Sequence, residues 1–497
     1  MSSYLMGIDL GTSSTKTLII DTAGRMAGIG NADYGIRIPH ISWAEQNPEE
    51  WWEAVKSSIG QAMEKAGASG SEIMGISFSG QMHGMVALDE NKEPVCPAII
   101  HLDQRSSEDL AEIRSLAGNL MQEELLNQPS AGMIISTIYW MKKHQRQVYD
   151  RIRYVMSAKD YISFRLCGEI GTEYTDAGAT LAFSVKNYRW CTELFERLDI
   201  RKEIWAPVHR SFEIAGEVTA RAAEETGLCP GTRIVYGAGD SMAALTGNGI
   251  IESGCITCNI GTASQLAAVA DQPIFDPQMR IQTWCHTVPG RWVVQSGTLN
   301  GGSTLSWLRS RILKTDKSFA QLDMEAGKTP AGADGLYFLP YLSGERTPYN
   351  EPKAKGVYFG LSMMHEQGHV VRATMEGILF NLKECLCILD AMSVKREKLI
   401  ASGGAARGVT WKQIQADMLD MPVYSTNIRE EACHGAAILA GVGVGVYKDI
   451  KEACQATITM SDKVVEPIRE NVKIYNEKQS VFHDLFYSVR DLYPRIV

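Results

Sequence analysis

The sequence has no uninterrupted apolar run of roughly 18 residues, which is the length that a membrane-spanning helix needs. Its first residues, "MSSYLMGIDLG", also lack the cationic start and the long apolar region of a secretory signal. These absences argue against membrane insertion and export. We therefore expect a cytoplasmic protein with no membrane partner.

Blocks of like charge are missing as well. The formal net charge is −9 over 497 residues, and acidic and basic residues are interspersed along the chain. A face that binds nucleic acid needs a concentrated basic footprint. Nucleic acid is therefore not an expected partner.

The 11 cysteines lack the regular spacing of a disulfide framework, and their number is odd. Reduced, buried thiols are the expected state. One C-x-x-C pair, Cys255 and Cys258, falls in an expected strand. Side chains three positions apart in a strand point to opposite faces, so we do not expect this pair to share a zinc ion or a disulfide.

The chain is long, and 45% of its residues are apolar. Because one hydrophobic core usually covers about 250 to 300 residues, we expect at least two domains. Residues 4–36 read as three strands joined by tight turns, and such short connections make antiparallel neighbours. Residues 47–67 read as a helix with Asn47 as its N-cap and Pro48 at its first position.

The opening theme of strand, Gly-Thr turn and strand returns at residues 254–270. Later, residues 397–426 alternate strand, glycine turn, helix and strand, and residues 433–445 read as a helix of small residues. We predict an α/β fold of mixed sheets flanked by helices, in two related halves, 1–249 and 250–497.

The stretch "DLGTSSTK" combines a carboxylate with a glycine turn rich in hydroxyl groups. Gly11, Thr12 and Ser13 form the turn, and consecutive backbone N–H groups in such a turn make a nest for an anion such as phosphate. Asp9 beside the nest can hold Mg²⁺ through water, and Lys16 can neutralise phosphate charge. By itself this turn is a weak signal, because Gly-Thr-Ser hairpins are common.

Two later turns strengthen the pattern. "NIGTAS" repeats the turn with Gly261 and Thr262, and in "SGGAARG" Gly403 and Gly404 let the backbone approach a flat adenine or ribose. Two phosphate-binding hairpins, one in each half, resemble the grip of the actin-like (ribonuclease H-like) ATPase superfamily. The resemblance implies two actin-like domains with a cleft between them, and ATP as the nucleotide.

Longer motifs make the resemblance specific. "GAGDSMAAL" at 237–245, "SGQMHG" at 79–84 and the stretch at 356–377 resemble the FGGY family of carbohydrate kinases. "QMHG" is similar to the xylulokinase branch of that family, where a glycerol kinase would be expected to show Arg-Glu. The resemblance implies ATP-dependent phosphorylation of a sugar or polyol hydroxyl, with Mg²⁺.

The resemblance also implies roles for single residues. Asp240 matches the catalytic aspartate, which accepts the proton of the substrate hydroxyl, and Asp9 and Asp240 match the metal side. Residues implied to bind the sugar are Gln81, Met82, His83, Asp103, Asp240 and Ser241. Residues implied to bind the nucleotide and its phosphates are Gly11, Thr12, Ser13, Lys16, Gly261, Thr262, Trp307, Gly403, Gly404 and Arg407.

The Met-His pair in this loop gives the expected sugar contact. His83 should hydrogen-bond a ketose hydroxyl, and Met82 should pack on the carbon face of the sugar. One departure from the xylulokinase pattern lies nearby, because "IIHLDQRS" has His101 where tryptophan is usual, although Asp103 remains. Arg407 likewise stands where relatives often have asparagine.

The stretch "HEQGH" fits the H-E-x-x-H zinc protease motif. However, Gly368 weakens a helix at this point, and the downstream run offers no histidine as a third ligand. We expect a helix start instead, with His365 near the N-cap and His369 on the first turn.

D-xylulose, giving D-xylulose 5-phosphate, is the first expectation for the substrate. A kinase for another ketose, polyol or aldonate (L-xylulose, ribulose, gluconate, glycerol) stays open. A non-catalytic sensor that binds ATP and sugar is the alternative of a different class, and the joint presence of Asp9 and Asp240 counts against it. The expected partners are therefore small molecules, and a homodimer stays open.

Overall fold

A computed structural model describes residues 3–496, and the chain divides into two compact units. Unit 1 runs to Ile251 and also contains Thr283–Trp292 and Ile428–Thr459, whereas unit 2 contains Glu252–Gln282, Val293–Asn427 and the described residues from Met460 on. The units therefore alternate along the chain. The division into halves 1–249 and 250–497 stays a prediction about sequence domains.

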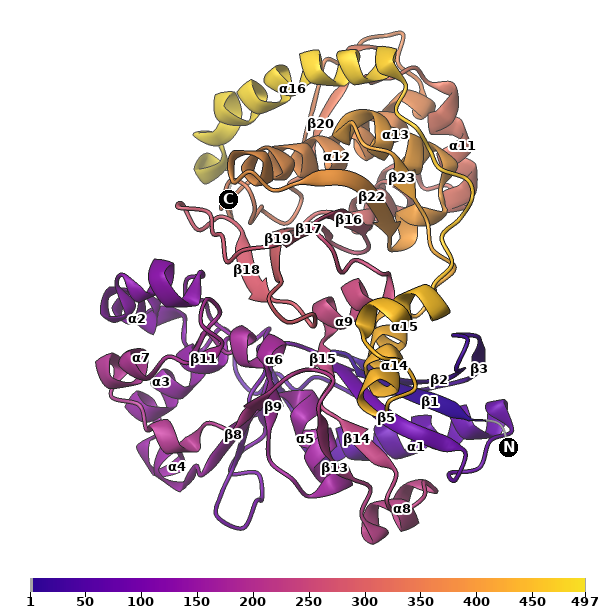
Figure 1. Cartoon of the computed structure of the whole chain (residues 1–497). Coiled ribbons are helices and arrows are strands. Elements are labelled where there is room, and N and C mark those ends of the chain that lie inside the picture. The colour runs from indigo at the N-terminus through magenta and orange to yellow at the C-terminus, as the bar shows by residue number, and fades with distance from the viewer. Residues whose placement is uncertain (1–2, 497) are drawn as a thin grey trace. The chain divides into compact units, whose positions relative to one another are not determined.

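The sheet of unit 1 begins with the three strands predicted from residues 4–36. β1 pairs antiparallel with β2, β2 pairs antiparallel with β3, and β5 and β14 add parallel neighbours on the other side of β1. The strand order is β13-β14-β5-β1-β2-β3, and β15 also pairs with β5 (Figure 1). The bounds are β1 Tyr4–Leu10, β2 Ser14–Asp21, β3 Met26–Asp33, β5 Ile73–Gly80, β13 Ile214–Glu217, β14 Arg233–Val235 and β15 Ala238–Gly239.

Helix α1 (Pro48–Ala66) confirms the predicted N-cap, Asn47, and Pro48 as the first helical residue. The Asn47 side chain accepts a hydrogen bond from the Glu49 amide, and Gly67 ends the helix in the left-handed conformation. Its buried residues Trp51, Trp52, Val55, Ile59 and Ala62 join the core of the first sheet. The helical spacing of these apolar residues explains why one face is covered.

Helix α14 (Glu431–Gly443) belongs to unit 1, although it comes late in the chain. It lies against β1, β5 and α9 (Asp240–Gly247), as Figure 1 shows. The approach is very close, because a Cβ on Gly7 of β1 would lie 2.0 Å from the Cys433 carbonyl oxygen. The small residues predicted for this helix therefore serve backbone-to-backbone packing.

The central strands of unit 2 repeat the pattern of unit 1. β16 pairs antiparallel with β17 and parallel with β22, and the strand order is β19-β17-β16-β22-β23. This matches β3-β2-β1-β5-β14 strand for strand, which confirms that the opening theme returns. The bounds are β16 Gly254–Ile260, β17 Ser264–Ala270, β19 Trp292–Thr298, β22 Arg396–Ser402 and β23 Val423–Tyr424.

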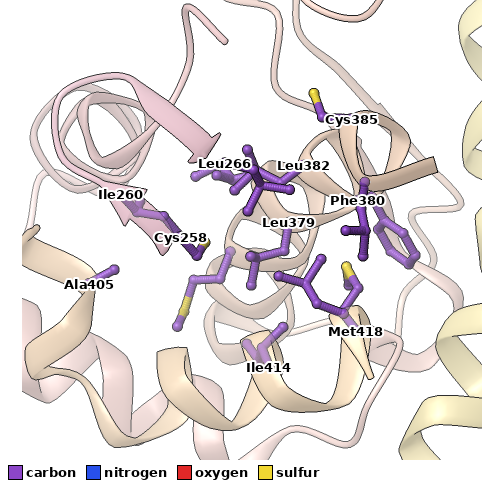
Figure 2. Close-up of a cluster of buried hydrophobic side chains, with 14 of the residues drawn as sticks. Cys258, Ile260, Leu266, Leu379, Phe380, Leu382, Cys385, Ala405, Ile414 and Met418 are labelled. Atoms are coloured by element: carbon purple, nitrogen blue, oxygen red, sulfur yellow. The ribbon is translucent and has the colours of Figure 1, made fainter. Parts of the chain in front are cut away.

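Helices α12 (Gln367–Ala391) and α13 (Val409–Leu419) contribute to the core of unit 2. Figure 2 shows Leu379, Phe380, Leu382 and Cys385 of α12 in the same apolar cluster as Cys258 and Ile260 of β16, Leu266 of β17, and Ile414 and Met418 of α13. The Cys258 thiol is therefore a core side chain in a strand, as the sequence predicted.

The start of α12 confirms the interpretation of "HEQGH". Glu366 is the N-cap, and its amide donates to His369 Nδ1 at 3.1 Å, while His369 Nε2 lies 3.0 Å from Asp334 Oδ2. His365 Nδ1 accepts from a backbone amide just before the helix. His369 thus takes part in the cap of α12, and His365 stabilises the turn that precedes the helix.

The remaining elements complete the two units. Further helices are α2 Leu110–Ala117, α3 Ile134–His144, α4 Arg146–Arg151, α5 Ala158–Cys167, α6 Tyr174–Ala179, α7 Thr192–Leu198, α8 Ala220–Thr226, α10 Gly302–Trp307, α11 Phe319–Lys328, α15 Ile450–Thr457 and α16 Arg469–Arg490. Short strands are β4 Glu45–Gln46, β6 Val86–Leu88, β7 Ala98–Ile99, β8 Tyr154–Met156, β9 Thr172–Glu173, β10 Phe183–Ser184, β11 Arg189–Trp190, β12 Val208–His209, β18 Gln282–Cys285, β20 Tyr337–Leu339 and β21 Val357–Phe359. Among residues 3–496, no helix has the length and apolar character to cross a membrane.

Candidate active site

Two carboxylates lie at the carboxyl end of β5. Asp9 of β1 is the register partner of Ser79 in the parallel strand β5, and the Ser79 hydroxyl donates to Asp9 Oδ1 at 2.7 Å. Asp240 begins α9 directly after β15, where Gly239 pairs with Gly80 of β5. Two adjacent residues of β5 therefore pair with Asp9 and with the residue that precedes Asp240. This is the edge at which open α/β sheets bind ligands.

The surroundings make Asp240 a suitable proton acceptor. Burial, reinforced by the negative charge of Asp9, raises the pKa of Asp240 to about 7, while a hydrogen bond of 2.6 Å from the Ser241 amide opposes the rise. Burial also raises the pKa of Asp9, against the effects of the Ser79 hydrogen bond and of Lys16. A carboxylate with a pKa near neutrality can take up a proton during a reaction at physiological pH.

The same carboxylates fit Mg²⁺. Burying a negatively charged carboxylate at this sheet edge costs free energy, and a bound divalent cation would offset that cost. Within the described chain, no group of three or more His, Cys, Asp or Glu side chains could hold a metal. Mg²⁺ commonly uses one or two carboxylates together with water and substrate phosphates, so Asp9 and Asp240 suit an ion that arrives with a nucleotide.

Lys16 has an ion-pair partner that sequence reasoning missed. Its Nζ lies 2.8 Å from Glu430 Oε2, and this hydrogen bond raises the pKa of Lys16. Lys16 is also the cross-strand partner of Asp9 in the β1–β2 hairpin. The cation therefore lies next to the predicted phosphate turn, with its side chain 40% exposed and already held in place by Glu430.

Carbonyl groups of the first Gly-Thr turn are hydrogen-bonded to Tyr34. The Tyr34 hydroxyl lies within hydrogen-bond distance of the Gly11 and Ser14 carbonyl oxygens, and the Tyr34 amide donates to the Ser13 carbonyl at 3.0 Å. The C=O and N–H of one trans peptide unit point in opposite directions. The amide groups that follow these carbonyls therefore face the other side of the turn, which is the arrangement of an anion-binding nest.

The second Gly-Thr turn is built in the same way within unit 2. The amide of Gly302 donates to the Gly261 carbonyl at 2.6 Å, and the Ser303 amide donates to the Thr262 carbonyl at 3.2 Å. These donors belong to the first turn of α10. Thr262 is exposed, and because each peptide unit is trans, the amides that follow these two carbonyls point to the other side of the turn.

The predicted adenosine motif lies beside the second turn. Gly403 has φ 72°, and a Cβ there would lie 2.7 Å from the Ile260 carbonyl oxygen, so this position requires glycine. Gly404 and Arg407 are exposed in the short 3₁₀ helix that follows. Trp307, at the end of α10, is partly buried against the core of unit 2, so its contact with adenine stays a prediction.

The loop after β5 packs against the residue that precedes Asp240. A Cβ on Gly239 would lie 2.6 Å from Met82 Cγ, so Met82 and the start of α9 are in close contact. His83 has φ 71°, and its Nδ1 lies 2.8 Å from the Ala179 carbonyl oxygen. A carbonyl only accepts, so Nδ1 carries the proton and Nε2 of the neutral ring is an acceptor. The imidazole also lies 5.5 Å, centroid to centroid, from the Trp284 ring.

Comparison with known protein families agrees with this geometry. The N-terminal domain profile of the FGGY family of carbohydrate kinases matches residues 4–247, and the C-terminal domain profile matches residues 256–444. The chain belongs to the FGGY family of carbohydrate kinases.

Individual relatives carry several activities. The chain is 31% identical over 492 residues to a xylulose kinase of Staphylococcus epidermidis, covering 99% of this chain and 98% of the relative. It is 30% identical over 508 residues to a gluconokinase of Bacillus subtilis, covering 100% and 98%. Among solved structures, a ligand-bound xylulose kinase from Lactobacillus acidophilus has a TM-score of 0.93 and 25% identity, with complete coverage of both chains.

This FGGY kinase uses Asp103 for internal contacts. The Asp103 carboxylate accepts from the Ala44 amide at 2.7 Å and from the Arg105 guanidinium at 2.9 Å, and Arg105 stacks on the Trp43 ring. Sugar binding by Asp103 stays a prediction. Nearby, burial lowers the pKa of His101, whose Nδ1 is buried with no hydrogen-bond partner among the described residues.

Sequence reasoning missed Trp284 and Glu430, which come from the late segments of unit 1. No local signal pointed to either residue, because each meets its partner across a long separation in sequence. Tyr34 could have been found, because it closes the strand that follows the first Gly-Thr hairpin.

Proposed function

We propose that this FGGY kinase transfers the γ-phosphoryl group of ATP to a hydroxyl of a ketose, with D-xylulose, giving D-xylulose 5-phosphate, as the first candidate. The contact between Met82 and Gly239 carries the proposal, because it joins the predicted sugar loop to the predicted base, Asp240. Phosphoryl transfer needs positioned phosphates, charge neutralisation and a base near the attacking hydroxyl, and little covalent chemistry.

Each part of the site has a role in this reaction. The Asp240 carboxylate accepts the proton of the attacking hydroxyl, for which its raised pKa suits it. His83 Nε2 accepts a hydrogen bond from a second hydroxyl, and Met82 packs on the carbon face of the sugar. Mg²⁺ held by Asp9 and Asp240 would neutralise charge on the transferred group when it is bound.

The two Gly-Thr turns supply the phosphate contacts. The amides of Thr12 and Ser14 face away from the hydrogen-bonded carbonyls of Gly11 and Ser13, as do the amides that follow Gly261 and Thr262. Lys16, held by Glu430, adds positive charge beside the first turn. ATP is the proposed nucleotide because each of the two turns has the form of a nest that fits a phosphate group.

An aldonate such as gluconate is the second candidate. The B. subtilis relative is named gluconokinase, and this chain has a partly buried His101 where xylulokinases have tryptophan. A change of this size beside the sugar loop alters the shape and polarity of the binding site. The phosphoryl chemistry at Asp240 would be the same for both substrates.

The proposal is tested by ADP release from purified protein with Mg²⁺ and ATP over D-xylulose, L-xylulose, D-ribulose, L-ribulose, glycerol and gluconate. A preference for D-xylulose supports the first candidate, and a preference for gluconate supports the second. Silence on every sugar would overturn the kinase proposal and favour a non-catalytic sensor.

A further inference from the structure

Gln46 connects the first phosphate turn with the sugar loop. It is the second residue of β4, which pairs with β7, and it directly precedes the N-cap of α1. Its side chain is 1% exposed. A buried amide of this kind must be satisfied internally, because an unpaired donor or acceptor there is costly.

All of the hydrogen-bonding capacity of the Gln46 amide is used. Nε2 donates to the carbonyl oxygens of Thr12 at 2.8 Å and Gly35 at 3.1 Å, and Oε1 accepts from Trp51 Nε1 at 3.2 Å and Gln81 Nε2 at 3.0 Å. Two donors and two lone pairs are what a primary amide offers. Carbonyl groups only accept and the indole N–H only donates, so the chemistry of the partners fixes which way this amide points.

The bond to Thr12 completes the phosphate turn. Tyr34 ties the neighbouring carbonyls of the turn, and Gln46 ties the carbonyl of Thr12. Because the peptide unit is planar and trans, the amide of Ser13 then points away from Gln46. Without the Gln46 donor, this peptide unit could rotate and withdraw one N–H from the nest.

The hydrogen bond to Gln81 fixes the orientation of the side-chain amide in the predicted sugar loop. Gln46 Oε1 accepts, so the Gln81 amide must present Nε2 to it and direct its own Oε1 elsewhere. Gln81 is 1% exposed, its Oε1 has no hydrogen-bond partner among the described residues, and its backbone amide donates to the Leu10 carbonyl at the end of β1. A buried acceptor held in this way is ready for a ligand hydroxyl.

We propose that Gln46 is a positioning residue that holds the first phosphate turn and the sugar-binding amide of Gln81 in one fixed arrangement. This inference rests on the proposed function. Gln46 itself touches neither ligand and acts through its neighbours. Its amide is the one group that bonds to both the Thr12 carbonyl and the Gln81 side chain in the described chain.

The substitution Gln46→Glu separates the effect on the phosphate turn from the effect on Gln81. A carboxylate keeps both acceptor functions toward Gln81 and Trp51, but it cannot donate, and it sets a negative charge against the Thr12 and Gly35 carbonyl oxygens. We expect the KM for ATP to rise by about tenfold or more, while the KM for the sugar changes much less. The near-isosteric Gln46→Met loses both sides, so both KM values should rise.

Trp51→Phe is the matched control. It removes the indole donor to the same Gln46 Oε1 and leaves the bonds to Thr12 and Gln81 in place. A purely structural role for this hydrogen-bond cluster predicts that Trp51→Phe and Gln46→Met behave alike. We expect instead a lower unfolding temperature for Trp51→Phe, with both KM values within about twofold of the wild type.

The outcomes distinguish the inference from the proposed function. Wild-type turnover combined with unchanged KM values in Gln46→Glu and Gln46→Met would overturn the inference alone. If Gln46→Glu does not fold, Gln46→Met decides on the same criterion. No turnover by the wild type on any sugar would overturn the proposed function, and the inference with it.

Discussion

His286, a buried histidine in the segment Thr283–Trp292 of unit 1, should make the protein less stable in mild acid. His286 is 1% exposed, its Nε2 donates to the Ile250 carbonyl at 2.9 Å, and its Nδ1 accepts from the Val288 amide at 2.9 Å. The hydrogen bonds of the two ring nitrogens therefore require the neutral imidazole. Protonating Nδ1 would set an N–H against the Val288 N–H. Burial, opposed by the Ile250 hydrogen bond, lowers the pKa of His286 from 6.5 to about 4.

The magnitude follows from this pKa difference. Between pH 6.5 and about 4 the unfolded chain binds a proton that the folded chain excludes, so the free energy of unfolding falls as the pH falls. The full contribution is present above pH 6.5 and is lost progressively toward pH 4. Each pKa unit is about 1.4 kcal/mol, so the total is about 3 kcal/mol, and about 1.3 kcal/mol of it is lost between pH values of about 7.5 and 5.5.

Equilibrium urea unfolding at several pH values, followed by the tryptophan fluorescence of the chain, tests this prediction. His286→Gln keeps a donor for the Ile250 carbonyl and cannot be protonated, so it should lose about 1 kcal/mol less than the wild type between the same pH values. Thr287→Val is the control, because it removes the hydroxyl that lies 3.2 Å from His286 Nδ1 and leaves an imidazole that can be protonated. Parallel pH profiles for wild type and His286→Gln would refute the reasoning.

Three further predictions concern the candidate site and the core. Asp240→Asn should lower kcat by about a hundredfold to ten-thousandfold, because the base is lost, while nucleotide binding measured by calorimetry persists. Near-normal turnover would show that Asp240 is not the base. His83→Ala should raise the KM for the best sugar by about tenfold and leave the KM for ATP unchanged; an unchanged sugar KM would count against the contact. Gln415 is 0% exposed, and neither of its amide atoms has a hydrogen-bond partner in the described chain. Gln415→Leu should therefore raise the free energy of unfolding by about 1 to 3 kcal/mol. A loss of stability in thermal melts would contradict this and point to a polar contact of Gln415.

Local signals predicted much of the fold. The hairpins of β1 and β16, the caps of α1 and the start of α12 all follow from turn residues and caps within a few positions of the element. The repeat of the strand order could also be predicted, because the same Gly-Thr hairpin opens both series of strands. These features depend on short-range sequence.

Long-range assembly could not be predicted in the same way. A helix of small residues such as α14 can pack closely against any backbone that also lacks side chains, and the sequence does not say which. Its glycine partner in β1, Gly7, lies more than 400 positions away. The pairing of Lys16 with Glu430 and of His83 with Trp284 depends on the same return of late segments to unit 1.

The candidate site was predictable where a motif is contiguous. The stretches around Asp9 and Asp240 predict both residues, and β5 pairs with Asp9 and with Gly239, which precedes Asp240. The role of Gln46 could not be predicted, because a glutamine before a helix cap has no distinctive local pattern. Its role depends on four partners from separate parts of the chain.

The central claim is phosphoryl transfer to a sugar, and product analysis tests it most directly. Purified protein would be incubated with Mg²⁺, ATP and D-xylulose, and the phosphorus products would be followed by NMR. The account predicts a sugar phosphomonoester that accumulates in step with ADP, and Asp240→Asn should nearly abolish it. ADP accompanied only by inorganic phosphate, or no change in ATP with any sugar of the panel, would contradict it.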